Sequence, residues 1–132
     1  MLETVMLNPK IAEDNIICYK VVIPIQDKKK DVEFERVKSN VIGYEYKVGV
    51  LNETIDICVD NQVYTDVDKT RFLIVKYGYH SYAHMADIAA VSSDQQIREC
   101  IIPKGSRYFV DVYEKQIASS NIIITEKIIN KK

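Results

Sequence analysis

The chain has 132 residues, of which 47% are hydrophobic and 28% are charged. This composition excludes a largely disordered chain, and it predicts a single globular domain over residues 1–132 with one core. The net charge of −1 excludes attraction of nucleic acid or anionic lipid by the whole surface, although it is compatible with a local basic patch.

The first third of the chain has the pattern of a β-sheet. Residues 16–23 form a continuous apolar run that stops at Pro24, which predicts a strand buried on both faces. A solvated lysine-rich turn follows, and residues 32–37 favour a half-exposed strand. Between Ile42 and Val50 apolar and polar residues alternate, so this strand should have one dry face and one wet face.

Further strands are expected in the middle of the chain. Residues 55–59 and 62–65 have the composition of short strands, and the dipeptide Asp60-Asn61 between them favours a turn. Residues 71–76 form another apolar run that ends near Gly78. These segments extend the predicted sheet.

One helix is predicted, and it begins at Ser81. Serine is a favoured N-cap, and the apolar residues after it fall on one face at helical spacing. These residues are Tyr82, Met85, Ala86 and Ala89.

The C-terminal part returns to strands, which are expected at residues 97–102, 106–112 and 122–129. Pro103 ends the first of them, and Lys104-Gly105 forms the turn to the second. The predicted class is therefore α+β, a mostly antiparallel sheet of about eight strands with one short helix.

The three cysteines, Cys18, Cys58 and Cys100, lie in apolar runs. Their number is odd and no C-x-x-C pair occurs, so neither a disulfide framework nor a zinc site is indicated. We expect three reduced, buried thiols. Because the first residues also lack the pattern of a signal peptide and no run is long enough to span a membrane, a cytoplasmic location is expected.

The densest group of functional side chains lies at the predicted junction between strand and helix, from Tyr77 to His84. A helix N-terminus there would offer free N–H groups to an anion, and tyrosine and histidine would add stacking and hydrogen bonds. The candidate binding residues are Tyr77, Tyr79, His80, Ser81, Arg107 and Tyr108. The structural alternative is a capped helix whose tyrosines fill its contact with the sheet.

Arg107 and Tyr108 belong to this candidate site because their strand follows the predicted helix by a short turn. Arginine recognises carboxylates and phosphates, and tyrosine and arginine are enriched at binding hot spots. By strand alternation, Tyr77 and Tyr79 should face one way and His80 the other, so one face packs and the other is free to bind.

No motif predicts catalysis, a metal or a cofactor. His80, His84 and Asp87 have the spacing H-x-x-x-H-x-x-D, but the residue after His80 is serine, where a zinc protease needs glutamate. The chain has no G-x-S-x-G elbow, and its four glycines are scattered rather than gathered in a phosphate loop. We therefore expect a protein more suited to binding than to turnover.

Several short motifs resemble small uncharacterised domains of phages and bacteria, some of which occur with pentapeptide-repeat proteins. The resemblance covers about residues 42–126. It rests on Tyr46-Lys47-Val48-Gly49, on Gly78-Tyr79-His80 with the Ala-bearing segment after it, on Ile102 to Phe109, and on Ala118-Ser119-Ser120. It carries no established activity to this chain.

The order of these elements also resembles a distant ADP-ribosyltransferase scaffold. That resemblance implies an Arg or His on the first strand, a Ser-Thr-Ser strand and a late Glu. Here the first strand has Cys18-Tyr19-Lys20 and the middle strand has His80-Ser81, while Glu99 or Glu114 would serve as the late acid. These departures argue against transferase activity.

Two functions are therefore considered. The first is a non-enzymatic binding protein of phage or prophage origin, acting in a bacterial cell on a protein or nucleoprotein partner, for example as an anti-CRISPR inhibitor of host defence. The second is a nucleotide-binding enzyme, or its remnant, on the transferase-like scaffold. Neither requires a membrane.

Overall fold

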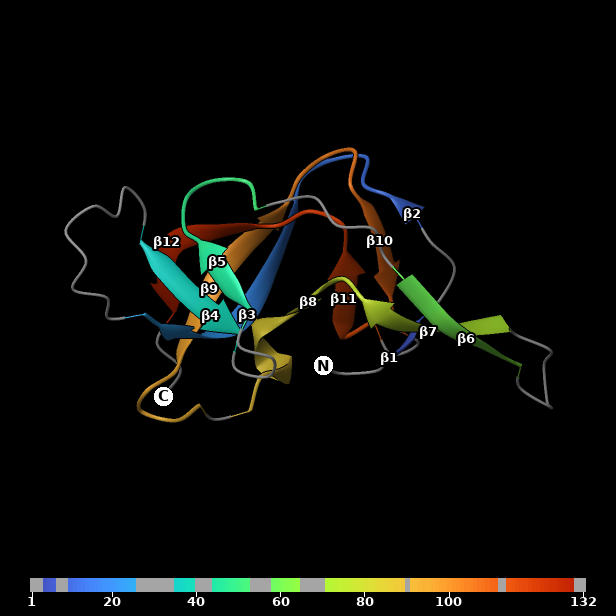
Figure 1. Ribbon diagram of the computed structural model, residues 1–132, viewed down its shortest axis with the longest axis horizontal. Coiled ribbons are helices and arrows are strands. Elements are labelled where there is room, and N and C mark those ends of the chain that lie inside the picture. The colour runs from blue at the N-terminus through green and yellow to red at the C-terminus, as the bar shows by residue number, and fades with distance from the viewer. Residues whose placement is uncertain are drawn as a thin grey trace.

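The computed structural model describes residues 4–6, 10–25, 35–39, 44–52, 58–64, 71–89, 91–111 and 114–129. Within them the chain forms twelve strands and one short 3-10 turn (Figure 1). The elements are β1 (Thr4–Met6), β2 (Lys10–Ile11), β3 (Ile16–Pro24), β4 (Arg36–Ser39), β5 (Glu45–Lys47), β6 (Cys58–Tyr64), β7 (Arg71–Tyr77), β8 (Tyr79–Tyr82), η1 (Met85–Asp87), β9 (Gln96–Ile102), β10 (Arg107–Val110), β11 (Gln116–Ser119) and β12 (Ile123–Ile129).

The strands form a large sheet of nine and a small sheet of three. Seven strands of the large sheet follow the order β12-β9-β3-β8-β11-β10-β2. The other two branch from it, since β4 pairs with β3 and β5 pairs with β4. Every strand pairing in this sheet is antiparallel. The small sheet, β1-β7-β6, lies at the end of the molecule away from β4 and β5 (Figure 1). The prediction of a mostly antiparallel β-structure is therefore confirmed.

β3 is the strand at which the large sheet forks. One edge of β3 pairs with β9 along seven residues. The other edge pairs first with β8, at Tyr19, and then with β4, from Val22 to Pro24. Because β5 continues from β4, two sets of strands diverge from β3 and can enclose side chains between them.

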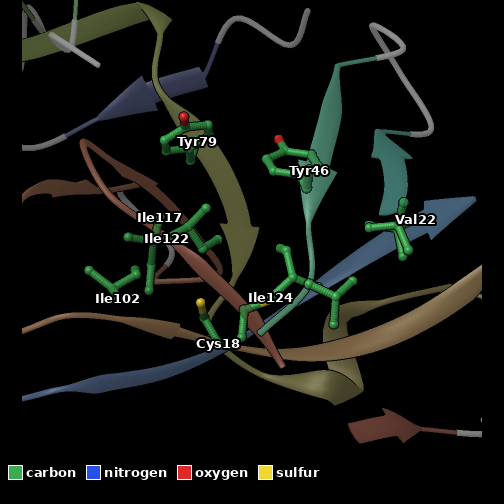
Figure 2. Packing of buried hydrophobic residues seen from close by; sticks show 11 residues of the cluster. Cys18, Val22, Tyr46, Tyr79, Ile102, Ile117, Ile122 and Ile124 are labelled. Carbon is green, nitrogen blue, oxygen red and sulfur yellow. The ribbon is translucent and has the colours of Figure 1, made fainter. Parts of the chain in front are cut away.

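That enclosed face of β3 forms the core. Figure 2 shows Cys18 and Val22 of β3 beside Tyr46 of β5, Tyr79 of β8 and Ile124 of β12. The predicted alternation is confirmed for the described part of residues 42–50, since Tyr46 and Val48 are buried whereas Glu45, Lys47 and Gly49 are exposed. The core therefore joins segments that are distant in the sequence.

The opposite face of β3 is less covered than the sequence indicates. Ile17 is 45% exposed, and Tyr19 and Val21 are only half-buried. The prediction that residues 16–23 are buried on both faces is therefore wrong. The apolar residues of this second face are therefore only partly covered.

The helix predicted from Ser81 is also wrong. Ser81 lies in β8 and pairs with Ile117 of β11, and the short turn η1 is the only helical element among the described residues. Without a helix of several turns, the anion-binding N-terminus that the sequence suggested does not form. Pairing with a distant strand has outweighed the local helical spacing.

The other predicted elements can be compared strand by strand. Strands expected at 71–76, 97–102, 106–112 and 122–129 are confirmed with small shifts at their ends. The turn expected at Asp60-Asn61 is wrong, because β6 continues through it with shifts of register against β7. Parts of the predicted strands at 32–37, 42–50, 55–59 and 62–65 lie outside the described residues.

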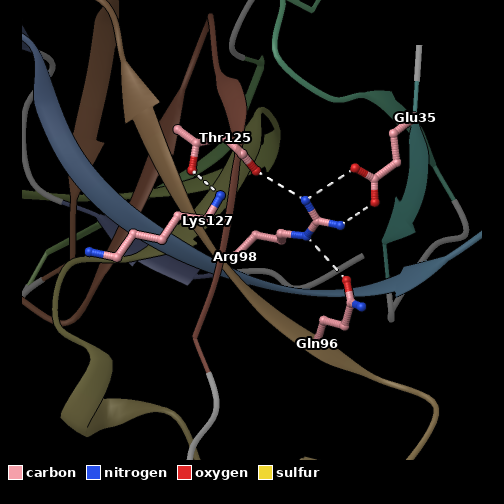
Figure 3. A network of polar contacts seen from close by, with 5 residues as sticks. All are labelled: Glu35, Gln96, Arg98, Thr125 and Lys127. Atoms are coloured by element: carbon pink, nitrogen blue, oxygen red, sulfur yellow. Dashed lines mark hydrogen bonds and ion pairs between the residues drawn. The ribbon is translucent and has the colours of Figure 1, made fainter.

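A buried arginine links β9 to its neighbours. Arg98 is 1% exposed, and its guanidinium is bound by the carboxylate of Glu35 (Figure 3). The same group donates to the Gln96 side chain at 3.1 Å and to the Thr125 carbonyl oxygen at 3.2 Å. These acceptors compensate a cation that would be costly to bury alone.

Candidate functional site

The predicted site residues of β8 lie mostly inside the protein. Tyr79 is 1% exposed and Ser81 is 2% exposed, so both belong to the interior. His80 points away from that face and is half-buried. The predicted division of the strand into a packed face and a second face is therefore present at these positions. Tyr77 ends β7, where it pairs with Cys58.

Tyr79 and Tyr108 are brought into one row across three strands. Ser119 of β11 pairs with Tyr79 on one side and with Tyr108 on the other. Paired residues of an antiparallel sheet share a face, so both tyrosines face the core side. Arg107, the next residue along β10, is exposed. The strand of Arg107 and Tyr108 thus lies near β8 as expected, with β11 between them.

Tyr108 also lines an open groove at the β2 edge of the large sheet. The groove has a volume of about 690 Å³ and is lined by the segment from Lys10 to Asp14 together with Ile16 and Tyr108. Ile11 is 57% exposed and pairs with Arg107. Tyr108 faces the core side of this edge, whereas Ile11 and Arg107 are paired on the opposite face. That face therefore presents an aliphatic and a guanidinium group together, a composition that suits a protein contact.

Lys20, which is not among the predicted binding residues, is a buried cation next to β8. It is 7% exposed, its ammonium donates to the His80 carbonyl oxygen, and its nitrogen lies 5.1 Å from the centre of the Tyr46 ring. Among the described residues no carboxylate forms an ion pair with it. Its pair partner across the sheet is Arg98, also a buried cation.

Two polar atoms beside Lys20 lack hydrogen-bond partners among the described residues. They are Nε2 of His80 and Oγ of Ser81. Nδ1 of His80 donates to the Gly78 carbonyl oxygen at 3.1 Å, which fixes the neutral ring in one tautomer. Burial, followed by the nearby charge of Lys20, lowers the pKa of His80 to about 4. His80 is therefore neutral at pH 7.

Three tyrosines close this region on the side of β5. The ring centres of Tyr44 and Tyr46 are 4.9 Å apart, and each lies 5.7 Å from the ring centre of Tyr79. The hydroxyl groups of Tyr44 and Tyr79 are 3.2 Å apart, within hydrogen-bond distance. Three of the nine tyrosines of the chain thus contribute to the core here rather than to a free surface.

A second surface lies on the less covered face of the large sheet. Ile17 pairs with Ile101, Ile101 with Ile123, and Ile123 forms a bridge to Leu51. We call these four residues the aliphatic row. Ile17 is 45% and Leu51 52% exposed, while the two residues between them are half-buried. The sequence does not indicate this row, because residues 16–23 are predicted to be buried on both faces and Leu51 lies outside the predicted strands.

Two of the three thiols are described, and both are buried. Cys18 and Cys100 are free and fully inaccessible, as predicted, whereas the Cys58 side chain lies outside the described residues. Burial raises the pKa of Cys100 well above its usual range. The facing Cys100 side chain lowers the pKa of Cys18, as does the Lys20 ammonium, whereas burial acts in the opposite direction.

No group of three or more metal-binding side chains occurs among the described residues, and no helix found there is long and apolar enough to cross a membrane. Comparison of the chain with protein-family models, curated protein sequences and solved structures found no match.

Proposed function

We propose that this chain is a non-enzymatic binding protein that acts by contact with a protein or nucleoprotein partner. The aliphatic row is the observation that supports the proposal. Soluble proteins seldom line up exposed aliphatic side chains on one face, and such patches are typical of interaction sites. As part of the same proposal, the protein is of phage or prophage origin and acts in the bacterial cytoplasm against a host defence, for example as an anti-CRISPR.

The surroundings of the row fit this role. Glu99 lies on the same face of β9 as Ile101, and it forms an ion pair of 3.4 Å with Lys127. Protein interfaces commonly have an apolar centre and a polar rim. The row and this ion pair form such an arrangement on one face of the sheet.

The partner surface is tested by placing a photo-crosslinking amino acid at single positions in the protein expressed in bacteria. Position 17 tests the aliphatic row and position 11 the groove, because both are exposed isoleucines on different parts of the large sheet. Exposed Lys38 on β4 is the negative control. We expect one discrete adduct from position 17. Adducts only from position 11 would move the site to the groove, and equal labelling of all three would contradict a specific surface.

The anti-defence role needs a separate test. Cells with an active CRISPR system are challenged with a targeted phage while they express either the parent chain or Ile17→Ser. We expect plaque formation with the parent and protection with the variant, provided that both melt at similar temperatures. If the parent does not restore plaques, this partner class is wrong even if the crosslinks persist.

A specific observation also favours the second candidate, a nucleotide-binding remnant on a transferase-like scaffold. Lys20 on the first long strand lies beside His80-Ser81 of the middle strand, where two polar atoms have no described partner. NAD or a cyclic nucleotide at about 100 times its Kd should stabilise the protein by about 2.7 kcal/mol. We expect that stabilisation to be absent in Lys20→Met, because the substitution removes the ammonium group beside His80 and Ser81.

A further inference from the structure

We propose that Cys18 and Cys100 form an oxidation site, at which a hydroperoxide converts two facing thiols into a reversible disulfide within one chain. This proposal is independent of the binding function. It concerns a pair of side chains that the aliphatic row and the groove do not use.

The register of the sheet carries the proposal. Cys18 of β3 is directly opposite Cys100 of β9, within an uninterrupted ladder of seven pairs. Opposed residues of antiparallel strands have Cα atoms about 4.5–5.5 Å apart. A disulfide requires a Cα separation of about 4.4–6.8 Å, so the two strands need little movement for the bond to form.

The two side chains also point to the same place. Both are fully buried in the same core cluster, and Figure 2 shows the Cys18 sulfur directed into it. The Cys100 thiol lies 3.4 Å from the Arg98 carbonyl oxygen, to which it donates. Since both cysteines are free, the structure represents the reduced form.

A buried cation lies beside the two thiols. Lys20 lies two residues from Cys18 along β3 on the same face, and its ammonium favours a thiolate at either cysteine, while burial opposes the charge at both. Either thiol can therefore react first, because the other is held opposite it to resolve the first product.

Both thiols are fully buried, so a hydroperoxide reaches them only when the sheet opens locally. With Cys18 as the first nucleophile, the reaction balances with one hydroperoxide. The Cys18 thiolate attacks a peroxide oxygen, the O–O bond breaks, and an alcohol, or water from hydrogen peroxide, leaves after taking up a proton. Cys18 is then a sulfenic acid. The Cys100 sulfur attacks the Cys18 sulfur, the S–O bond breaks, and water leaves with the Cys100 proton. Two thiols lose two electrons in total and the peroxide gains them.

The test uses Cys58→Ser, which retains the two thiols of interest. The folded variant is exposed to hydrogen peroxide, quenched, denatured and alkylated, and its peptides are mapped without reduction. We expect a monomer that has lost two hydrogen atoms, with the peptides of Cys18 and Cys100 linked, and dithiothreitol should restore both thiols. The melting temperature should rise by about 5 °C or more, because the bond closes a long loop.

The double variant Cys18→Ser/Cys58→Ser is the matched control, and hydrogen peroxide should not raise its melting temperature. Two alkylated thiols after peroxide, separate sulfinic acids, or disulfides between chains would each overturn the proposal. If Cys58→Ser does not fold, the same map of the parent protein decides the matter. The Cys18–Cys100 link with Cys58 alkylated supports the proposal, and any link through Cys58 contradicts it.

Discussion

His80 shows how one residue can couple the interior of this protein to pH. Its ring is held by Gly78, and its Nε2 has no partner among the described residues. The buried ammonium of Lys20 is bound to the backbone oxygen of the same residue. A second positive charge in this place is unfavourable, so the folded protein resists protonation of the ring.

This predicts that the protein loses stability in mild acid. Because the pKa of His80 is about 4 in the fold and about 6.5 in the unfolded chain, the unfolded chain binds more protons between these values. The stability is complete above about pH 6.5 and falls as the pH drops towards 4. From pH 7 to 4.5 the free energy of unfolding should fall by about 2 kcal/mol through this residue.

Urea unfolding of the parent and of His80→Gln at both pH values measures this effect. The difference in pH dependence between the two proteins isolates the contribution of His80. Exposed His84 provides the control, since His84→Gln should retain the pH dependence of the parent. Identical pH dependence in the parent and His80→Gln would show that the ring is not kept neutral by the fold.

At the level of elements, the sequence predicts those strands whose own residues favour a strand, whatever they pair with. The runs that became β3, β7, β9 and β12 are rich in branched apolar residues, which favour strands. β11 has no such signal, because its Gln-Ile-Ala-Ser sequence is short and small. The second half of β8, from Ser81, has the pattern of a helix start, since its pairing with β11 cannot be recognised without the partner strand.

The same limit applies to the candidate site. The proximity of Arg107 and Tyr108 to β8 followed from chain order, but the burial of Tyr79 and Ser81 depends on the layer that β4 and β5 place over the sheet. Lys20 was missed because a single lysine in an apolar run is normally expected to reach solvent. Only the folded sheet places it between His80 and Tyr46.

The turn from β9 to β10 was predicted at Lys104-Gly105, and it supplies an element-scale prediction. Gly105 has a φ of 90°, and the Ser106 amide donates to the Pro103 carbonyl oxygen at 3.1 Å. A Cβ at Gly105 would meet no atom within 4 Å, so Gly105→Ala introduces backbone strain without a clash. We expect a loss of about 1–2 kcal/mol in the free energy of unfolding.

Chemical denaturation of Gly105→Ala measures that loss, with Lys104→Ala as the control in the same turn. Lys104 is exposed, and its backbone amide, which donates to Asn15, is unchanged by the substitution. We therefore expect Lys104→Ala to unfold like the parent. Equal stability of Gly105→Ala and the parent would mean that the turn relaxes at no cost.

At the scale of the whole molecule, the large sheet has two unequal faces. The enclosed face carries the core cluster, whereas the other face carries the aliphatic row. Most of the folding energy of a small domain comes from apolar area removed from water. An isoleucine on the enclosed face should therefore contribute much more to the free energy of unfolding than an isoleucine on the other face.

Ile124 and Ile17 test this difference directly. Ile124 is fully buried in the core, so Ile124→Ala should reduce the free energy of unfolding by about 2–5 kcal/mol through lost contacts and a cavity. Ile17 is 45% exposed, and Ile17→Ala should cost less than about 1 kcal/mol. Urea unfolding of both variants at low protein concentration provides the comparison, and equal losses would contradict the two-faced sheet.

The same measurement at high protein concentration shows what covers the aliphatic row. If the loss of free energy of unfolding in Ile17→Ala rises with concentration, another copy of the chain covers the row, whereas a constant loss leaves the row free for a different partner.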